Sequence, residues 1–269
     1  MQSNEPGIPL PGPAANDPGP ARLVMPGRKV RAGAGVDWVG DGWRLFRKAS
    51  LMWIVFLVLF TLIHLGMGMV PWVGMWIGNL VSPILLGGIA LGCRSLETGG
   101  DLELEHLLAG FRRNTGLLFA IGVVYALGEL ALFGVFGLFA GPSFLSAILR
   151  GDEVAMASSL PDDPMQLALG ALVTAALAIP LLAAYWFAPA LAMLHGVPAI
   201  PAMKASLVAC VRNAVPMLVN GLVMGALLVP AILPLGLGLV VWAPLMLATI
   251  YVSYRSIFTE ADELAEDAP

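Results

Sequence analysis

The sequence predicts an all-α membrane protein, a polytopic bundle of six transmembrane helices built as three parallel repeats of an interfacial helix plus a helical hairpin. Three observations carry this prediction. Of the 269 residues, 58% are hydrophobic and only 12% are charged, with a mean hydropathy of +0.85, whereas soluble domains carry about 25% charged residues. Six apolar stretches are long enough to cross a bilayer. The basic residues lie almost entirely in the segments that join or flank the spans on one side of the membrane.

The apolar stretches define the spans. They cover residues 50–70, 73–93, 117–140, 165–190, 214–229 and 236–254. Pro71 and Trp72 mark a tight turn, so the first two spans form an antiparallel hairpin. Pro180 and Pro189 interrupt the fourth span. We expect a kink there, because proline removes a helical hydrogen bond.

Two tails flank the membrane domain, which we assign to residues 36–259. Residues 1–35 are rich in proline and glycine and hold no apolar core of the kind that a signal peptide needs. With so little apolar area to bury, this segment is expected to be a disordered cytoplasmic tail. Residues 260–269 are expected to form a short acidic cytoplasmic tail.

A short amphipathic segment precedes the first, third and fifth spans. An apolar face beside basic residues suits a helix at the lipid headgroup boundary. The predicted apolar faces are Val36, Val39, Trp43 and Phe46; Leu104, Leu107, Leu108 and Phe111; and Met203, Leu207 and Val211. For residues 36–48, packing against the bundle is an equal and compatible alternative. All three units enter from the same side, so they are parallel repeats about an axis along the membrane normal.

Charge sets the predicted orientation. Every Lys and Arg except Arg150 lies before the first span, between the second and third, between the fourth and fifth, or after the sixth. The positive-inside rule assigns these segments to the cytoplasm. The sequence therefore predicts a multi-pass membrane protein with both termini cytoplasmic. The outer connection, residues 141–164, is expected to be a plain connector in which Asp163 caps the fourth span.

Five basic residues stand at the junctions between amphipathic segments and spans: Arg47, Lys48, Arg112, Arg113 and Arg212. A basic residue near the membrane surface attracts anionic lipid by about 1 kcal/mol. The expected partner is therefore the lipid bilayer, with anionic lipid at the cytoplasmic face. Nucleic acid is not expected as a partner, since the chain has no compact soluble basic domain. The sequence does not decide between a monomer, a homo-oligomer and a complex with another protein.

Glu129 is the acidic residue placed well inside a span. A charge at mid-bilayer costs at least about 2.5–3.5 kcal/mol, so Glu129 should face the bundle interior or be protonated. It is a candidate proton or cation site. The alternative is a neutral glutamic acid bonded to a neighbour, with Tyr125 one turn earlier or Asn220 of the fifth span as the partner. Asn79 and Asn220 are expected to bond between helices.

No catalytic residue, metal site or cofactor is predicted. The sequence holds no nucleophile elbow, HExxH or Walker pattern, and His64, His106 and His195 lack the spacing of metal ligands. Cys93 and Cys210 are expected to be free thiols on the reducing side. Four glycine pairs at GxxxG spacing permit close helix contacts.

Several segments together resemble a bacterial family of uncharacterised six-helix inner-membrane proteins. The resemblance covers residues 36–259 and implies the fold and the location, with no established activity. The layout is also similar to the membrane half of membrane-anchored glycerophosphodiester phosphodiesterases, without a counterpart of their soluble catalytic domain. The matching segments are GWRLFR (42–47) with Trp53, GCR (92–94), HLLAGF (106–111), WFAPA (186–190), AMKAS (202–206), RN (212–213) and SYRSIF (253–258).

Two functional hypotheses follow. The first is a non-catalytic helix bundle that supports envelope or lipid organisation, based on the three amphipathic segments and the lack of a catalytic set. The second is a small transporter or channel that uses Glu129 in the bundle interior. A membrane enzyme is disfavoured because catalytic motifs are missing.

Overall fold

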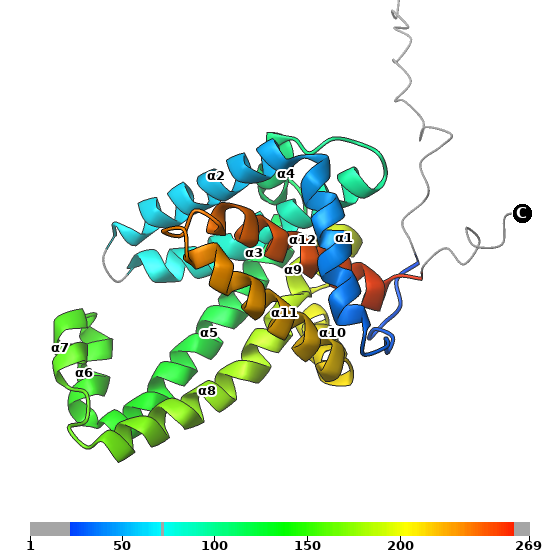
Figure 1. Ribbon diagram of the computed structural model, residues 1–269. Helices are drawn as coiled ribbons and strands as arrows, with labels where there is room; N and C mark the ends of the chain where they lie inside the picture. Colours follow the sequence, from blue (N-terminus) through cyan, green and yellow to red (C-terminus); the bar gives the residue numbers. More distant parts are fainter. Residues whose placement is uncertain (1–21, 71–72, 261–269) are drawn as a thin grey trace, which may run out of the picture.

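The computed structural model describes residues 22–70 and 73–260, and its fold is all-α (Figure 1). Six helical segments are long and apolar enough to cross a membrane, which confirms the predicted polytopic bundle. The helices are α1 (Ala34–Lys48), α2 (Ser50–Gly68), α3 (Val73–Glu97), α4 (Leu104–Leu108), η1 (Ala109–Phe111), α5 (Thr115–Ala140), α6 (Pro142–Arg150), α7 (Glu153–Ser158), α8 (Pro164–Trp186), α9 (Ala188–His195), α10 (Ala199–Arg212), α11 (Ala214–Ile232) and α12 (Leu239–Phe258). Short helix and hairpin alternate three times in this order.

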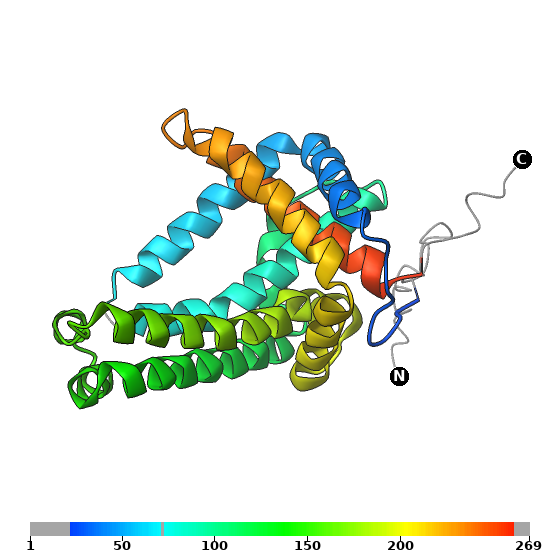
Figure 2. The same cartoon turned by 60° about the horizontal axis from the view of Figure 1, so that its bottom comes forward.

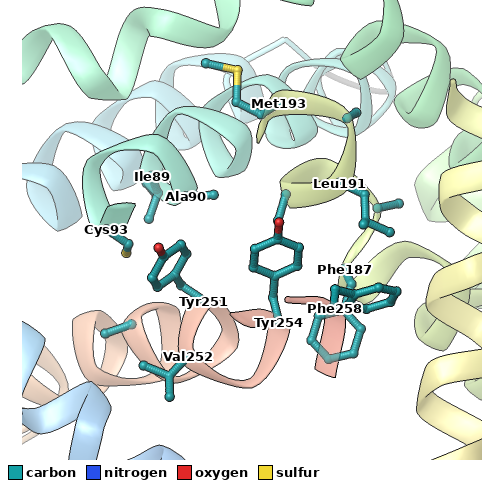
Figure 3. Packing of buried hydrophobic residues seen from close by; sticks show 14 of the residues in the cluster. Ile89, Ala90, Cys93, Phe187, Leu191, Met193, Tyr251, Val252, Tyr254 and Phe258 are labelled. Carbon is teal, nitrogen blue, oxygen red and sulfur yellow. The ribbon is translucent and has the colours of Figure 1, made fainter. Parts of the chain in front are cut away.

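The bundle is tight at one end and spread at the other. We call the tight end, which carries α1, α4 and α10, the basic end. Toward the opposite end the α11–α12 hairpin diverges from α5 and α8 (Figures 1 and 2). The buried hydrophobic core lies in the basic-end half, where α3, α9 and α12 meet (Figure 3). In the apolar stretches of α3 and α12, 50% of the residues are buried inside the protein, against 6% in the span Pro164–His195. Helices α3 and α12 are therefore the central spans.

Each short helix packs on the repeat that precedes its own. The α4–η1 segment packs on α3 of the first repeat, and α10 packs on α8 and α9 of the second. The first short helix, α1, packs on α11 and α12 of the third repeat. Helix α1 therefore closes a ring of three units.

Small residues explain this docking. A side chain at Gly35 would collide with the backbone of Pro216, and one at Gly42 would meet Thr249 Oγ1 at 2.6 Å. In the same way a side chain at Gly110 would collide with the backbone of Ile84. Helix α10 uses alanines and Ser206, which is fully buried. Close backbone approach maximises van der Waals contact, the main attraction between helices in lipid.

The predicted apolar faces pack only in part. In α1, Phe46 is buried, but Val36 is 53% and Trp43 is 39% exposed. The buried face of α1 is Ala34, Gly35, Trp38, Gly42, Leu45 and Phe46. The alternative that Val36 and Trp43 pack on the bundle is therefore wrong, because the two glycines, which carry no hydropathy signal, decide which side approaches the bundle. The assignment of this face to the headgroup boundary stays a prediction.

The other two short helices behave similarly. Leu107 is buried against α3, while Leu104, Leu108 and Phe111 remain exposed. In α10, Met203 is buried and Val211 is 68% exposed. Each short helix thus packs with one side and leaves apolar side chains on another.

The fourth span breaks at Phe187, two residues before Pro189 and close to the expected kink. Here the hydroxyl of Ser206 accepts a hydrogen bond from the Phe187 N–H (2.9 Å) and donates one to the Ala183 carbonyl (2.6 Å). A side chain inserted in this way interrupts the helical ladder. Pro180 lies inside α8 and does not end it.

Residues 22–33, assigned from the sequence to a disordered tail, pair with the end of α12 and with Asn213. Leu23 forms an isolated β-bridge with Thr259. The Val30 N–H donates to Asn213 Oδ1 (2.9 Å), and Asn213 Nδ2 donates to the Arg28 carbonyl (3.0 Å). Backbone bonds to the end of α12 and side-chain bonds to Asn213 thus hold a segment that has no apolar periodicity. Residues 1–21 of the predicted tail and residues 261–269 of the acidic tail lie outside the described ranges.

The connection between the third and fourth spans, residues 141–164, contains two short helices, α6 and α7. Phe144, Ala147 and Ile148 bury one face of α6. Asp163 accepts a hydrogen bond from the Met165 N–H (3.0 Å), which confirms it as the cap of the fourth span.

Candidate functional site

A polar cluster lies within the spans on α5, which packs against α3 and against α8. Asn79 Nδ2 of α3 donates a hydrogen bond to Glu129 Oε2 of α5. Tyr125 lies one turn before Glu129, and its ring packs against that of Tyr185 of α8, with 4.5 Å between centroids. Asn79, Tyr125, Glu129 and Tyr185 are all half-buried. Three spans therefore contribute to one cluster around a single carboxyl group.

Local sequence explains the geometry of this cluster. A side chain at Gly122 would lie 2.6 Å from the Asn79 carbonyl, so α3 and α5 can approach closely only because residue 122 is glycine. Glu129 follows Gly122 by two turns, on the same side of α5. It stands fourteen residues after Thr115, which is about 21 Å from the basic end at 1.5 Å per residue. Donors that converge on a carboxylate at this depth reduce the cost of its charge.

Asn220 is not part of this cluster. Its Nδ2 donates to the Gly35 carbonyl (3.4 Å), because α11 packs on α1 and α12. The prediction that Asn220 could serve Glu129 was wrong. Asn79 is the residue of another helix that binds Glu129. The sequence predicted a bond between helices for Asn79 but did not identify Glu129 as its partner.

A second polar network ties three helices together at the basic end. Tyr251 Oη of α12 donates to Glu97 Oε2 of α3 (2.6 Å), and Arg255 of α12 forms an ion pair with Glu97. Arg255 also lies 3.8 Å from Asp41 of α1, which pairs with Arg44 at 2.7 Å. Figure 3 shows Tyr251 next to Cys93 of α3. This network was missed from the sequence.

The comparisons with known proteins give a clear relative. The chain is 30% identical over 204 residues to the probable inner membrane protein BTH_II0599 of Burkholderia thailandensis. The aligned residues cover 74% of this chain and 75% of that protein. This chain belongs to the same family. No family model matches, and no solved structure matches. The resemblance to glycerophosphodiester phosphodiesterases stays a prediction, since no comparison bears on it.

This member of the family is thus a multi-pass inner-membrane protein, and its junctional basic residues fall into two groups. Arg47, Arg112 and Arg113 are exposed and make no ion pair or side-chain hydrogen bond with another described residue. Lys48 Nζ donates to the Leu96 carbonyl (2.9 Å), and Arg212 reaches the Gly27 carbonyl (3.4 Å). The first group therefore has no side-chain partner among the described residues, and the second binds backbone carbonyls within the protein.

The histidines of this inner-membrane protein have structural partners. His64 Nε2 bonds to Ser82 Oγ (2.9 Å), and His106 Nδ1 accepts from the Glu103 N–H (3.0 Å) in a capping box at the start of α4. Within the described ranges, no group of three His, Cys, Asp or Glu side chains is placed to hold a metal. Cys93 and Cys210 are both buried and free.

Proposed function

We propose that this inner-membrane protein is non-enzymatic and organises anionic lipid at its basic end, which faces the cytoplasm. One observation carries the proposal: each short helix docks on the bundle with one side and leaves exposed apolar side chains beside exposed basic ones. Trp43 lies near Arg47 on α1, Phe111 precedes Arg112, and Val211 precedes Arg212. We call these three pairs the lipid strips.

The physical basis is the structure of the headgroup region. An aromatic or aliphatic side chain enters the upper acyl region, while a neighbouring guanidinium reaches the lipid phosphate. Since each strip belongs to a helix fixed on the bundle, binding requires little ordering of the protein. Three strips around a ring would gather anionic lipid around the basic end.

Native mass spectrometry of the purified protein tests this function with phosphatidylglycerol against phosphatidylcholine. Replacing Arg47 and Arg112 together by glutamine should lower the preference for phosphatidylglycerol about 30-fold, at about 1 kcal/mol for each charge. The control is Arg31→Gln with Arg150→Gln, which removes the same charge. In the wild-type protein Arg31 pairs with Asp37, and Arg150 lies at the opposite end. An equal effect of both pairs, or no preference in the wild type, contradicts the proposal.

The cytoplasmic orientation of the basic end is supported by the distribution of Lys and Arg. It is tested with single cysteines at exposed positions, Leu149→Cys and Lys204→Cys. A membrane-impermeant maleimide added to spheroplasts should label the first and spare the second. The reverse pattern overturns the orientation.

A second candidate function is the transfer of a proton or small cation through the bundle. It is favoured by the convergence of Asn79, Tyr125 and Tyr185 on Glu129. Proteoliposome flux, followed with a pH-sensitive dye, should disappear in Glu129→Gln and persist in Asn220→Leu, since Asn220 lies outside the cluster. Wild-type flux equal to that of empty liposomes eliminates this candidate, as does unchanged flux in Glu129→Gln.

A further inference from the structure

Arg94 is a half-buried arginine in the last turn of α3. Within the described ranges it makes no ion pair and no side-chain hydrogen bond. Glu97, one turn later, is already bound by Tyr251 and Arg255. A partly buried guanidinium without an anion loses hydration that no counter-charge replaces. The environment of Arg94 is therefore incomplete.

The groups around Arg94 are hydrogen-bonding side chains from two other helices. His195, at the end of α9, has its Nε2 2.5 Å from the hydroxyl of Tyr254 of α12. Cys93, the residue before Arg94, lies next to Tyr251 (Figure 3), and the ring centroid of Tyr251 is 6.0 Å from that of Tyr254. Helix α3 packs on α9, so the three elements are neighbours. Figure 3 shows the Tyr254 side chain extending from α12 toward α9.

We propose that Arg94, His195 and Tyr254 form a phosphate-binding site at the basic end of the bundle. A guanidinium presents a planar fork of donors that matches two phosphate oxygens. The Tyr254 hydroxyl adds a donor when the Nε2–H of His195 donates to its oxygen, because the two groups are bonded to each other and cannot both donate outward. The phosphate belongs either to a lipid headgroup or to free inorganic phosphate, since the chemistry is shared. This goes beyond the proposed function, because it defines one site separate from the lipid strips.

The site explains why Arg94 stays unpaired in a region where the other charges pair. Arg255 and Asp41 join α12 to α1, and Glu97 joins both to α3. Arg94 has no anion partner among the described residues, while His195 and Tyr254 lie on α9 and α12, which both pack on α3. Because α3 and α12 are the central spans, a phosphate held there lies inside the ring of short helices.

The experiment uses the full chain in uncharged detergent with two probes, inorganic phosphate by calorimetry and phosphatidylglycerol by native mass spectrometry. Arg94→Gln should weaken binding of the effective probe about 10- to 100-fold, as expected for the loss of a charge-assisted bidentate contact. Arg94→Lys should recover part of it, because it restores the charge without the fork. Arg31→Gln is the control, since it removes an exposed, paired arginine.

The two probes identify the source of the phosphate. A response to inorganic phosphate supports a free-phosphate site, and a response to phosphatidylglycerol alone supports a headgroup site. Tyr254→Phe removes only one hydroxyl and keeps the test open if Arg94→Gln does not fold; it should weaken binding about 5-fold. The proposal is overturned if the wild type binds neither probe, or if Arg94→Gln and Tyr254→Phe bind as tightly as Arg31→Gln.

The same measurements separate this site from the lipid strips. Arg47→Gln with Arg112→Gln changes the strips and leaves Arg94 in place. If that pair loses phosphatidylglycerol while Arg94→Gln loses no more than Arg31→Gln does, and inorganic phosphate does not bind, the strips account for all binding and the Arg94 site is rejected.

Discussion

Replacing Ser206 by alanine should destabilise the protein at the break between α8 and α9. Its hydroxyl is fully buried and forms two hydrogen bonds, 2.9 Å from the Phe187 N–H and 2.6 Å to the Ala183 carbonyl. The alanine leaves both backbone groups without this partner. They can pair directly only if α9 straightens onto the axis of α8, which would pull the buried Leu191 out of the core.

The magnitude follows from these two bonds. Burying an unsatisfied polar group costs about 1–3 kcal/mol, so a loss of about 2 kcal/mol in the free energy of unfolding is expected. For a chain of this size, that corresponds to about 4–8 °C in Tm. The assay is thermal unfolding in detergent, followed by circular dichroism at 222 nm.

The matched control is Ser253→Ala. Ser253 is also buried, but its hydroxyl donates to the Ile250 carbonyl within its own helix (2.8 Å), so its loss should lower Tm by less than half as much. If Ser206→Ala unfolds at the wild-type temperature, or if both variants lose the same stability, the inserted hydroxyl does not hold the break and the reasoning is refuted.

Two further predictions concern α1 and α10. Gly42→Ala should be less stable than Gly40→Ala. Both variants gain the helix propensity of alanine, but only position 42 faces Thr249, while position 40 is open. Their free energies of unfolding in urea should therefore differ by about 1–3 kcal/mol. Equal stabilities would mean that α1 does not approach α12 this closely. Burial raises the pKa of Cys210 to about 12; since the thiolate is the reactive form, about 1 in 10,000 molecules should carry it at pH 8. Alkylation of Cys210, measured by peptide mass spectrometry, should therefore be slow in the folded protein. Its rate should rise about tenfold per pH unit below that pKa and should become fast when the protein is unfolded. Fast alkylation of the folded protein at pH 8 contradicts the burial of Cys210.

The spans could be predicted from the sequence because their signal is local. Long apolar runs exclude other structures, so α5 begins within two residues of the expected start. The ends were less certain: α3 continues past Cys93 to Glu97. That extra turn places Glu97 opposite Tyr251 and Arg255, and the network it forms was therefore missed.

The partners of the polar residues could not be predicted. Glu129 stood out because its charge is costly in a span. The sequence offered Tyr125 or Asn220 as the partner of Glu129. Finding Asn79 required knowing which spans are neighbours, and that depends on glycines such as Gly122 and Gly35. A glycine in the sequence indicates where a helix can pack closely against another helix, but it does not identify that other helix.

The ring has a consequence for how the protein is made. The docking face of α1, with Gly35 and Gly42, leaves the ribosome early, yet its partners Asn220 and Thr249 follow about 200 residues later. At about 5–20 residues per second, that delay is about 10–40 seconds. During this interval α1 has no native partner, and its amphipathic character lets it rest on the membrane surface. Helix α1, which precedes the other described helices in the chain, is then among the last to dock, and a nascent chain halted before α11 would remain an open array.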